Sequence, residues 1–505
     1  MARGMRRREF LRFVAAGSGG MALAGLLAAC GGSPTATSAP SAAPSRAPSA
    51  APSVAPSAAP SSAAAASAAP ASAASSAAAA ATPTRPAAPS AAATPSAAPA
   101  TPAASGNVVF FVTGDLAEKE AYQTIVNAFN GRQTRIKVEL QHVPSADDYT
   151  KRLTADFAAG TPADVILLNY RRFGAYAAKG AFDPVGPYLA QSSVLKQTDF
   201  YPELIAPFSR NGVLVGIPQN ASSLVIYYNK DMFTKAGVAF PKAGWTWDDF
   251  LTSAQALTKG TEQYGVTIAA QMIRVAPFIW QNGGDIVDNL AKPTKLTFDR
   301  PESLEAAQWF IDLQVKHKVA PDAVQQAAEA DEARFLNGRA AMFFESRRFT
   351  PTLREQKLFD FDVAALPQRK VRASILHSDA YLLTSASKNK AAAFAFMEYA
   401  NGPDGQPVIA ATGRTVPSIK AVAETPTFLN PTEKPLNNRA FIEAIPIIRP
   451  TINIDTTEQI ESIVNTELRR AFLGQAPLTD AITLMNSRTA ELFKPQRSLR
   501  GRRRQ

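Results

Sequence analysis

The residue types that most often carry catalysis are few in this chain and widely spaced. The three histidines, His142, His317 and His377, lie far apart, and none has the spacing of a metal-ligand pair. The sequence contains no P-loop, no GxSxG and no HExxH motif, and its one cysteine is Cys30. Scattered carboxylates could still meet in space as a catalytic pair. The sequence therefore predicts a protein that is not an enzyme and holds no cofactor or metal, with a carboxylate-dependent enzyme as the open alternative.

Cys30 closes a segment with the layout of an export signal. Arginines crowd the first twelve residues, and the apolar stretch 13–29 that follows is too short and too weakly apolar for a membrane-spanning helix. The sequence "LAAC" at 27–30 resembles a bacterial lipobox, whose cysteine is acylated, and "RREFLR" at 7–12 resembles a twin-arginine motif. We expect an extracytoplasmic protein anchored in the cell membrane through Cys30 and exported by either the twin-arginine or the general secretory route.

The segment 31–107 is almost entirely Ala, Pro, Ser, Thr and Gly. It cannot bury enough apolar surface to offset the entropy of ordering, so the composition predicts a disordered stalk. The formal net charge of +11 is concentrated in the export signal, the stalk and the tail 494–505, which ends in "RSLRGRRRQ". The body, 108–493, is close to neutral and lacks the basic surface expected of a nucleic-acid-binding protein.

Apolar runs and amphipathic patterns alternate along the body. "NVVFFVTG", "IKVELQHV" and "DVILLN" have the pattern of buried strands, and "EKEAYQTIVNAFNGR" and "DYTKRLTADFAAG" have that of helices. This alternation predicts an α/β fold with mostly parallel sheets flanked by helices. Ligands of such sheets bind beyond the carboxyl ends of the strands, which directs attention to the segments 113–118 and 169–172.

Six segments in order resemble the family 1 extracellular solute-binding proteins, the sugar receptors of ATP-binding-cassette (ABC) importers. They are "DYTKRLTADFAAGTPADVILL", "GIPQNASSLVIYYNKDMFTKAGVAFPKAGWTWDDFLTSAQALT", "PFIWQNGGDIVD", "FLNGRAAMFFES", "SKNKAAAFAFMEYANGPDGQ" and "TGRTVPS". The resemblance implies two lobes that close on a ligand, one formed by 108–220 plus 372–430 and the other by 221–371 plus 431–493.

The same resemblance implies a monomeric receptor that captures a carbohydrate and delivers it to the membrane subunits of a permease. A sugar phosphate or an acidic sugar is the alternative ligand, since arginine binds oxyanions through two parallel hydrogen bonds. A secreted carbohydrate-active enzyme and a stalked surface adhesin are the alternatives from other functional classes.

The expected ligand-binding residues follow from the positions that match the family. Candidates on the loops after predicted strands, at the crossing between lobes and at a stacking platform are Asp115, Glu118, Tyr170, Arg171, Arg172, Asn220, Ser222 and Trp280. The segments "FFESRRF" and "ILHSDAYLL" depart from the family pattern and add Glu345, Arg347, Arg348, Asp379 and Tyr381, with His377 beside them. Arg414 in "TGRTVPS" is interpreted as structural.

Overall fold

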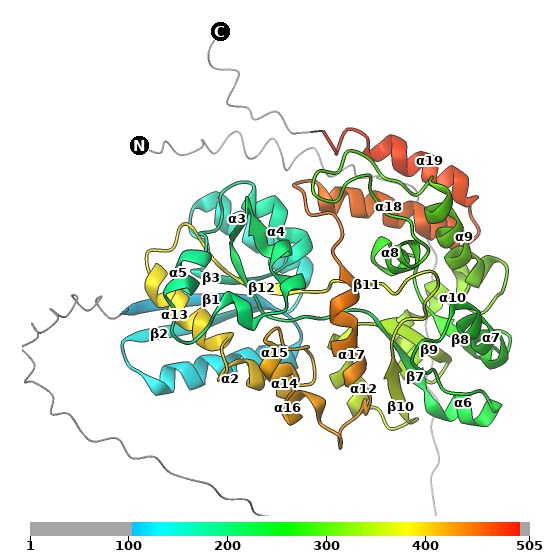
Figure 1. The fold of residues 1–505 in the computed structure, drawn as a ribbon, viewed down its shortest axis with the longest axis horizontal. Helices are drawn as coiled ribbons and strands as arrows, with labels where there is room; N and C mark the ends of the chain where they lie inside the picture. Colours follow the sequence, from blue (N-terminus) through cyan, green and yellow to red (C-terminus); the bar gives the residue numbers. More distant parts are fainter. Residues whose placement is uncertain (1–103, 495–505) are drawn as a thin grey trace, which may run out of the picture. The chain divides into compact units, whose positions relative to one another are not determined.

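Residues 104–494 are described by a computed structural model, in which they form two α/β lobes, each built on its own sheet (Figure 1). The predicted export signal with Cys30, the stalk up to residue 103 and the tail from residue 495 lie outside the described residues. The first strand, β1 (Gly106–Thr113), begins within the predicted stalk, because the backbone N–H of Gly106 already donates to the carbonyl of Arg135 at 3.0 Å. The ordered body therefore starts at residue 106 or earlier, rather than at 108.

The first lobe is built on a five-stranded sheet in the order β2-β1-β3-β12-β6. Besides β1, its strands are β2 (Ile136–Val143), β3 (Val165–Asn169), β12 (Asp379–Leu383) and β6 (Gly216–Pro218). Its helices come from two distant stretches of the chain: α2 (Leu116–Arg132), α3 (Ala146–Ala159), α4 (Tyr170–Ala177), α5 (Gly186–Gln191), α13 (Lys390–Ala400), α14 (Gln406–Ala411), α15 (Lys420–Ala423) and α16 (Pro426–Leu429).

Helices cover both faces of this sheet, with α3 and α4 on one side and α2 on the other (Figure 1). The alternation of β1 explains the arrangement, since successive side chains of a strand point to opposite faces. The ring of Phe110 packs on Tyr122 of α2 and Phe396 of α13, at centroid distances of 5.7 and 5.1 Å. The ring of Phe111 packs on Tyr149 of α3 at 4.5 Å. A continuous apolar strand is thus buried from both sides, as the sequence pattern predicts.

The second lobe is built on a four-stranded sheet in the order β10-β7-β9-β8. Its strands are β7 (Val225–Asn229), β8 (Tyr264–Thr267), β9 (Ala340–Glu345) and β10 (Phe361–Ala364). The remaining helices are α6 (Lys230–Ala236), α7 (Trp247–Leu257), α8 (Met272–Gln281), α9 (Pro301–Val315), α10 (Ala323–Ala328), α11 (Asp331–Leu336), α12 (Thr350–Glu355), α17 (Arg439–Ala444), α18 (Thr457–Phe472) and α19 (Leu478–Thr489).

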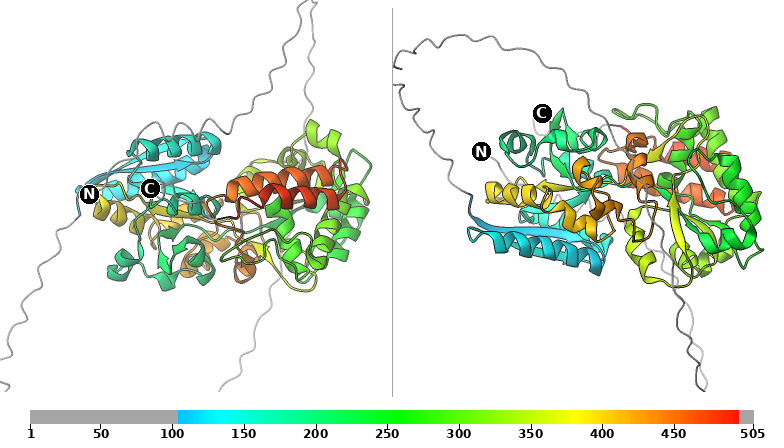
Figure 2. Two further views of the ribbon diagram at one scale, coloured as in Figure 1. Left: turned by 90° about the horizontal axis from the view of Figure 1, so that it is seen from above. Right: turned by 60° about the horizontal axis from the view of Figure 1, so that its bottom comes forward.

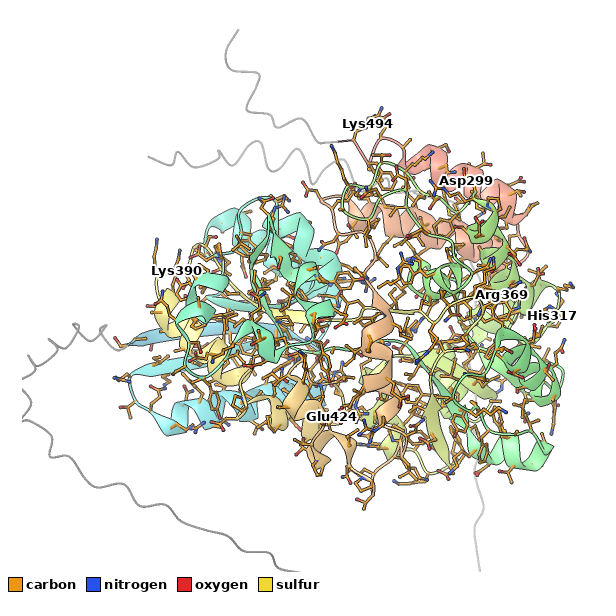
Figure 3. All side chains as sticks on the ribbon, viewed as in Figure 1. Asp299, His317, Arg369, Lys390, Glu424 and Lys494 are labelled. Atoms are coloured by element: carbon orange, nitrogen blue, oxygen red, sulfur yellow. The ribbon has the colours of Figure 1, made fainter. Side chains whose placement is uncertain are left out.

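The second sheet is also buried on both faces. Phe344 of β9 packs on Phe250 of α7 and Phe278 of α8, at 5.5 and 5.6 Å between ring centroids. The neighbouring Phe343 points the other way and packs on Phe349 at 5.2 Å. Side chains fill the space on both sides of the ribbon, whereas charged residues such as Lys494 lie at its outer edge (Figure 3).

Each sheet contains one strand that runs against its neighbours, β12 in the first and β7 in the second. The other strands of each sheet share one direction. In both sheets the reversed strand is the first one that the chain forms after crossing from the other lobe. The reversed strand begins at the edge of its sheet that faces the other lobe. The other strands of the sheet, which run in the opposite direction, end at that same edge. The prediction of mostly parallel sheets is therefore confirmed, with these two exceptions.

The two crossings lie side by side. The outgoing crossing, residues 219–224, forms an isolated bridge between Ser222 and His377 of the returning crossing, residues 365–378. The returning crossing also contains β11 (Ser374–Ile375), which pairs in parallel with β13 (Ile448–Arg449). These paired segments connect the lobes, which lie on either side of them in all three views (Figures 1 and 2). Within residues 104–494, none of the helices has the length and apolar character needed to cross a bilayer.

Gly265 permits α7 and β8 to approach closely, and this predicts a strong effect of adding one methyl group. A Cβ built on Gly265 would lie 2.0 Å from the carbonyl oxygen of Ala254 in α7, so backbone must move. We expect Gly265→Ala to lower the free energy of unfolding by about 1–3 kcal/mol or more.

The matched control is Gly131→Ala in the last turn of α2, where a Cβ meets nothing within 4 Å. Alanine favours a helix over glycine by up to about 1 kcal/mol, so this variant should be neutral or more stable. Urea unfolding of both variants checks the prediction, and an equal stability of the two would contradict it.

Candidate ligand-binding cleft

A cavity of about 340 Å³, the inner chamber, lies where the strand ends of the two lobes face each other. Its position follows from the fold, because β1, β3, β8 and β9 all end at this level and β12 begins there. The described residues that line it are Glu118, Asn169, Arg171, Asn220, Ser222, Gln271, Ile273, Arg274, Glu345, Ser346, Arg348, His377, Asp379, Arg414 and Thr415. Ile273 is the one apolar side chain among these residues.

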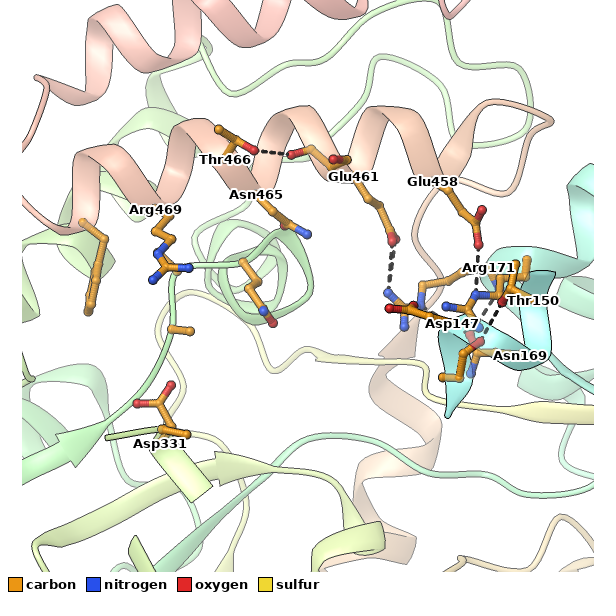
Figure 4. A pocket seen from close by; sticks show the side chains of 18 of the residues that line it. Asp147, Thr150, Asn169, Arg171, Asp331, Glu458, Glu461, Asn465, Thr466 and Arg469 are labelled. Atoms are coloured by element: carbon orange, nitrogen blue, oxygen red, sulfur yellow. Dashed lines mark hydrogen bonds and ion pairs between the residues drawn. The ribbon is translucent and has the colours of Figure 1, made fainter. Parts of the chain in front are cut away.

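Two further cavities adjoin the inner chamber. The side chamber, about 350 Å³, shares Glu118, Arg348, Asp379 and Arg414 with it and reaches Asp115. The outer chamber, about 1150 Å³, shares Arg171 and lies between α3 and α4 of the first lobe and α18 of the second (Figure 4). The three chambers together form one cleft between the lobes.

The cleft brings together nine of the thirteen predicted ligand-binding residues. They line the inner, side or outer chamber and are Asp115, Glu118, Arg171, Arg172, Asn220, Ser222, Glu345, Arg348 and Asp379. Local structure positions the first of them: Asp115 caps α2 by accepting a hydrogen bond from the backbone N–H of Glu118 at 2.9 Å. At the end of β3, the Asn169 side chain caps α4 by accepting from the N–H of Arg171.

Three predicted aromatic contacts lie elsewhere, because their rings are used in the core. The hydroxyl of Tyr170 shares a hydrogen bond of 3.0 Å with the Thr451 hydroxyl. The indole N–H of Trp280 donates to Asp285 at 3.0 Å. Tyr381 packs on Phe110 at 5.5 Å, inside the first lobe. The predicted stacking platform at Trp280 therefore does not face the cleft, and the inner chamber has no aromatic lining among the described residues.

Arg347 also points away from the cleft, although its neighbour Arg348 lines it. Its guanidinium is buried between the rings of Phe428 and Phe441, 4.4 and 5.0 Å from their centroids, and donates to Asn438. Burial lowers the pKa of Arg347 to about 9. The two arginines lie in a 3₁₀ turn, Arg347–Phe349, where successive side chains point about 120° apart, so Arg348 reaches the cleft and Arg347 does not.

The sequence interpretation missed Arg274, Gln271 and the role of Arg414. Arg274 and Gln271 lie at the start of α8, a few residues beyond the end of β8. Because ligands of such sheets bind beyond the carboxyl ends of strands, these two residues could have been predicted from the sequence. Arg414, interpreted as structural, lines the inner chamber and pairs with Asp115 and Glu118. No signal in the sequence points to that pairing, since the partners lie 299 residues apart.

Glu118 is the lining carboxylate with the most altered ionisation. Burial is the main cause that raises the pKa of Glu118, and the nearby Asp379 and Asp115 add to it. Arg414, whose Nη2 lies 2.8 Å from the Glu118 Oε2, offsets the rise only in part, so the pKa is about 7. Glu345 behaves in the opposite way. Burial opposes its ionisation, but Arg274 and Arg348, at 2.6 and 3.1 Å, outweigh burial and hold the pKa of Glu345 well below its usual range.

Asp379 is held without a cation. Its Oδ1 accepts from the Asn169 amide at 3.1 Å and its Oδ2 accepts from the Asn220 amide at 3.0 Å. Within residues 104–494, no lysine, arginine or histidine nitrogen lies within salt-bridge distance of it. Nearby, Ser222 Oγ, His377 Nε2 and Arg274 Nη1 are buried and lack a hydrogen-bond partner among the described residues. These atoms are available to a ligand.

Two ion pairs join the lobes across the cleft. Arg171 of α4 contacts Glu461 of α18 at 3.1 Å, and Arg172 contacts Glu458 at 2.9 Å (Figure 4). The two glutamates are three residues apart on α18 and therefore share one face of that helix. Within the described residues, no group of three or more His, Cys, Asp or Glu stands close enough to hold a metal ion.

The ionisation of Glu118 predicts a pH dependence of stability. A carboxyl whose pKa is higher in the folded protein, about 7, than its ordinary value of 4.5 binds its proton more tightly in that state. Between these pH values the folded state binds more protons than the unfolded state, so Glu118 lowers stability progressively as pH rises.

We expect Glu118→Gln to remove this loss, so that the stability of the variant relative to the natural protein increases from pH 4.5 to above 7. Urea unfolding across this pH range measures it. Glu120→Gln, at an exposed position on the same helix, is the control. Parallel pH profiles for the natural protein and Glu118→Gln would show that Glu118 ionises normally.

The interlobe ion pairs predict a salt-sensitive spacing of the lobes. The pairs are partly exposed, so each should contribute up to about 1 kcal/mol at low salt. We expect the double variant Glu458→Gln and Glu461→Gln to show a larger radius of gyration by small-angle scattering, and added salt to enlarge the natural protein but not the variant. Asp404→Asn, which breaks an exposed pair with Arg132 inside the first lobe, is the control. A double variant that scatters like this control would contradict the prediction.

Comparison with known proteins agrees with this geometry. The model of the bacterial extracellular solute-binding protein family matches residues 113–407. The chain is 25% identical over 316 residues to the mannitol-binding protein of Pseudomonas aeruginosa, covering 60% of this chain and 68% of that protein. It is 29% identical over 155 residues to the sn-glycerol-3-phosphate-binding periplasmic protein of Agrobacterium fabrum, covering 30% of this chain and 36% of that protein.

Among solved structures, an ABC substrate-binding protein of Listeria monocytogenes in complex with cycloalternan superposes with a TM-score of 0.70 at 23% identity. The superposition covers 76% of this chain and 98% of that one, and at this identity it shows the fold. The two-lobed fold and a family match that spans more than half of the chain lead to one conclusion: this chain belongs to the bacterial extracellular solute-binding protein family.

Proposed function

We propose that this protein captures a small, hydroxyl-rich solute of the carbohydrate type outside the cytoplasm and delivers it to an ABC permease. The family match supports a solute-binding role. The observation that carries the proposal is the inner chamber, where polar side chains from both lobes meet in one cavity of about 340 Å³. A ligand that contacts both lobes favours their closed arrangement, and a permease can distinguish closed from open.

The lining favours hydroxyl groups. Asp379, Asn220 and Gln271 offer carboxylate and amide oxygens and amide N–H groups, and Ser222 and Thr415 offer hydroxyls. A polyol presents alternating donors and acceptors that such a set can satisfy. The mannitol-binding relative is consistent with a ligand of this class. Because the inner chamber lacks an aromatic platform, a small polar solute fits it better than a stacked oligosaccharide.

A phosphorylated or acidic sugar is the second candidate ligand, and it has two supports. One is the resemblance to a glycerol-3-phosphate-binding protein. The other is the presence of four arginines in the lining of the inner chamber. We rank it second because each of these guanidiniums already contacts a carboxylate.

We propose further that Cys30 is acylated and that the segment 31–105 is a stalk that holds a monomeric receptor near its permease. Several acyl chains hold a protein durably in a bilayer, since each buried CH₂ contributes about 0.8 kcal/mol. A stalk of this composition lets the body reach the permease without a fixed orientation. These statements rest on the sequence.

An enzyme acting on carbohydrates is a weaker alternative. Its chemistry would need one carboxyl to donate a proton and another to act as a base or nucleophile. Glu118 has a suitably raised pKa of about 7, but its Oε2 is 2.8 Å from Arg414. Glu345 lies between two arginines. Such pairing suits fixed polar contacts better than proton transfer, and the family match favours binding.

The experiment is a thermal-shift and scattering screen of the mature protein with neutral polyols, sugars and their phosphates. A true ligand should stabilise the protein by about 2.7 kcal/mol at one hundred times its Kd, shrink the radius of gyration and be recovered chemically unchanged. Asn220→Ala should weaken its binding at least tenfold, about 1.4 kcal/mol. Asn127→Ala, exposed on α2, should not.

A ligand that stabilises the protein without reducing its radius of gyration would refute the proposal that the lobes close on the solute for delivery. Chemical conversion of the ligand would favour the enzyme. Failure of every sugar, polyol and phosphate to bind would refute the carbohydrate class.

A further inference from the structure

The inner chamber combines an unneutralised carboxylate with buried acceptor atoms, and this combination limits the charge of the ligand. Building on the proposed function, we propose that the preferred solute carries a primary amine beside its hydroxyl groups, and that this ammonium binds at Asp379, Ser222 and His377. Amino sugars and aminopolyols are the chemical class that satisfies these requirements.

The arginines of the inner chamber do not provide an unneutralised site for an anion. Arg171 contacts Glu461 at 3.1 Å, Arg274 contacts Glu345 at 2.6 Å, and Arg414 contacts Glu118 at 2.8 Å. A phosphate would have to displace one of these carboxylates, which would then lie unpaired close to the new anion. That exchange replaces one charge pair with another and adds repulsion.

The fourth arginine, Arg348, is held by two carboxylates, those of Glu345 and Glu332. One nitrogen of Arg274, Nη1, is free of a partner among the described residues. One nitrogen of this kind can donate to a hydroxyl oxygen, whereas a phosphate dianion needs donors around all of its oxygens.

Asp379 differs from the other carboxylates that line the inner chamber. The lining contains four arginines and three carboxylates, Glu118, Glu345 and Asp379. Glu118 and Glu345 contact arginines, whereas within residues 104–494 no cation contacts Asp379. Asp379 is therefore the lining carboxylate that can pair with a cation of the ligand. An ammonium entering here gains a charge-assisted hydrogen bond, which is roughly twice as strong as one between neutral groups.

The acceptors stand on one side of the two crossings. Asn220 and Ser222 are two residues apart on the outgoing crossing, and His377 and Asp379 are two residues apart on the returning one. Because residues two apart in extended chain share a face, all four side chains point the same way. The contact between the Asn220 amide and Asp379 Oδ2, at 3.0 Å, agrees with this placement.

The number of acceptors matches an ammonium group, which carries three N–H donors. Asp379 retains lone pairs beyond the two that accept from Asn169 and Asn220. Ser222 Oγ and His377 Nε2 are buried and without a partner among residues 104–494. Burial, assisted by Arg171 and Arg274, lowers the pKa of His377 to about 3, so its imidazole is neutral and can accept a hydrogen bond.

The test is calorimetry on the mature full-length protein with two matched sets of probes. One set is glucosamine, glucose and glucose 6-phosphate, and the other is glucamine, glucitol and glucitol 6-phosphate. We expect the amine of at least one set to bind ten times more tightly than its neutral parent, about 1.4 kcal/mol, and the phosphate to bind more weakly than the parent.

Variants assign the effect to the chamber. Asp379→Asn should weaken binding of the amine at least ten times more than binding of the neutral parent, and so abolish the preference for the amine. Ser222→Ala, a milder change, should reduce the preference by at least threefold if Asp379→Asn does not fold. Asp404→Asn, which removes an exposed carboxylate paired with Arg132, should leave the preference intact.

The possible results distinguish failure of the amine preference from failure of the proposed solute-receptor function. If a neutral parent or a phosphate binds as tightly as the amine, the receptor function stands and the amine inference is wrong. A preference for the amine that survives in both chamber variants also refutes the assignment. If no probe of either set binds and no sugar or polyol binds in the wider screen, the proposed carbohydrate class fails, and this inference fails with it.

Discussion

The hydrogen-bonded junction at Asp379 is the interaction on which the arrangement of this protein depends. One carboxylate joins the end of β3, through Asn169, to the outgoing crossing, through Asn220. Asp379 itself begins β12, the strand by which the chain returns to the first lobe. Its carbonyl also accepts from the backbone N–H of Gln219 at 2.8 Å. The lobes are therefore connected at the point where the ligand is expected to bind, so a ligand contact here acts directly on the segments between the lobes.

The charges around this junction are organised as pairs rather than as a cationic pocket. Arginines near a cleft suggest an anionic ligand when they are considered alone, but each lining arginine has a carboxylate partner. A buried arginine without such a partner is strongly disfavoured by desolvation, and Arg347 shows how that is managed, with two aromatic rings and an amide around it. Pairing keeps the arginines charged and fixes their direction. The walls of the cleft are thus polar and joined by ion pairs.

The same pairing extends across the mouth of the cleft. Arg171 lines the inner chamber and also contacts Glu461 on the other lobe. A movement of the lobes would therefore act on a side chain that also lines the inner chamber. The pairs are partly exposed and individually weak, so they bias the closed arrangement without locking it. A receptor that must release its solute requires such a modest bias, because a large one would hold the lobes closed without ligand.

Local sequence determined the elements of this protein and the level at which its site lies. The apolar runs at 107–114 and 136–143 and the helix that ends at Gly160 are found where their patterns predict them. The rule that ligands bind beyond strand ends directed attention to 113–118 and 169–172, and Asp115, Glu118 and Arg171 of these segments line the cleft. These features depend on side-chain periodicity and capping, which act over a few residues, so neighbouring sequence is sufficient to predict them.

Tertiary structure alone decided which of two adjacent residues enters the cleft and which carboxylate neutralises which arginine. Tyr170 and Arg347 turn into the core while Arg171 and Arg348, one position later, face the chamber. Arg171 pairs with a glutamate 290 residues away, and Arg414 with an aspartate 299 residues away. The physical reason is that facing and pairing are settled by how whole elements pack. Adjacent side chains of a helical turn point about 100–120° apart, and packing decides which of them faces the cleft. Partners brought together by folding leave no mark in the local sequence.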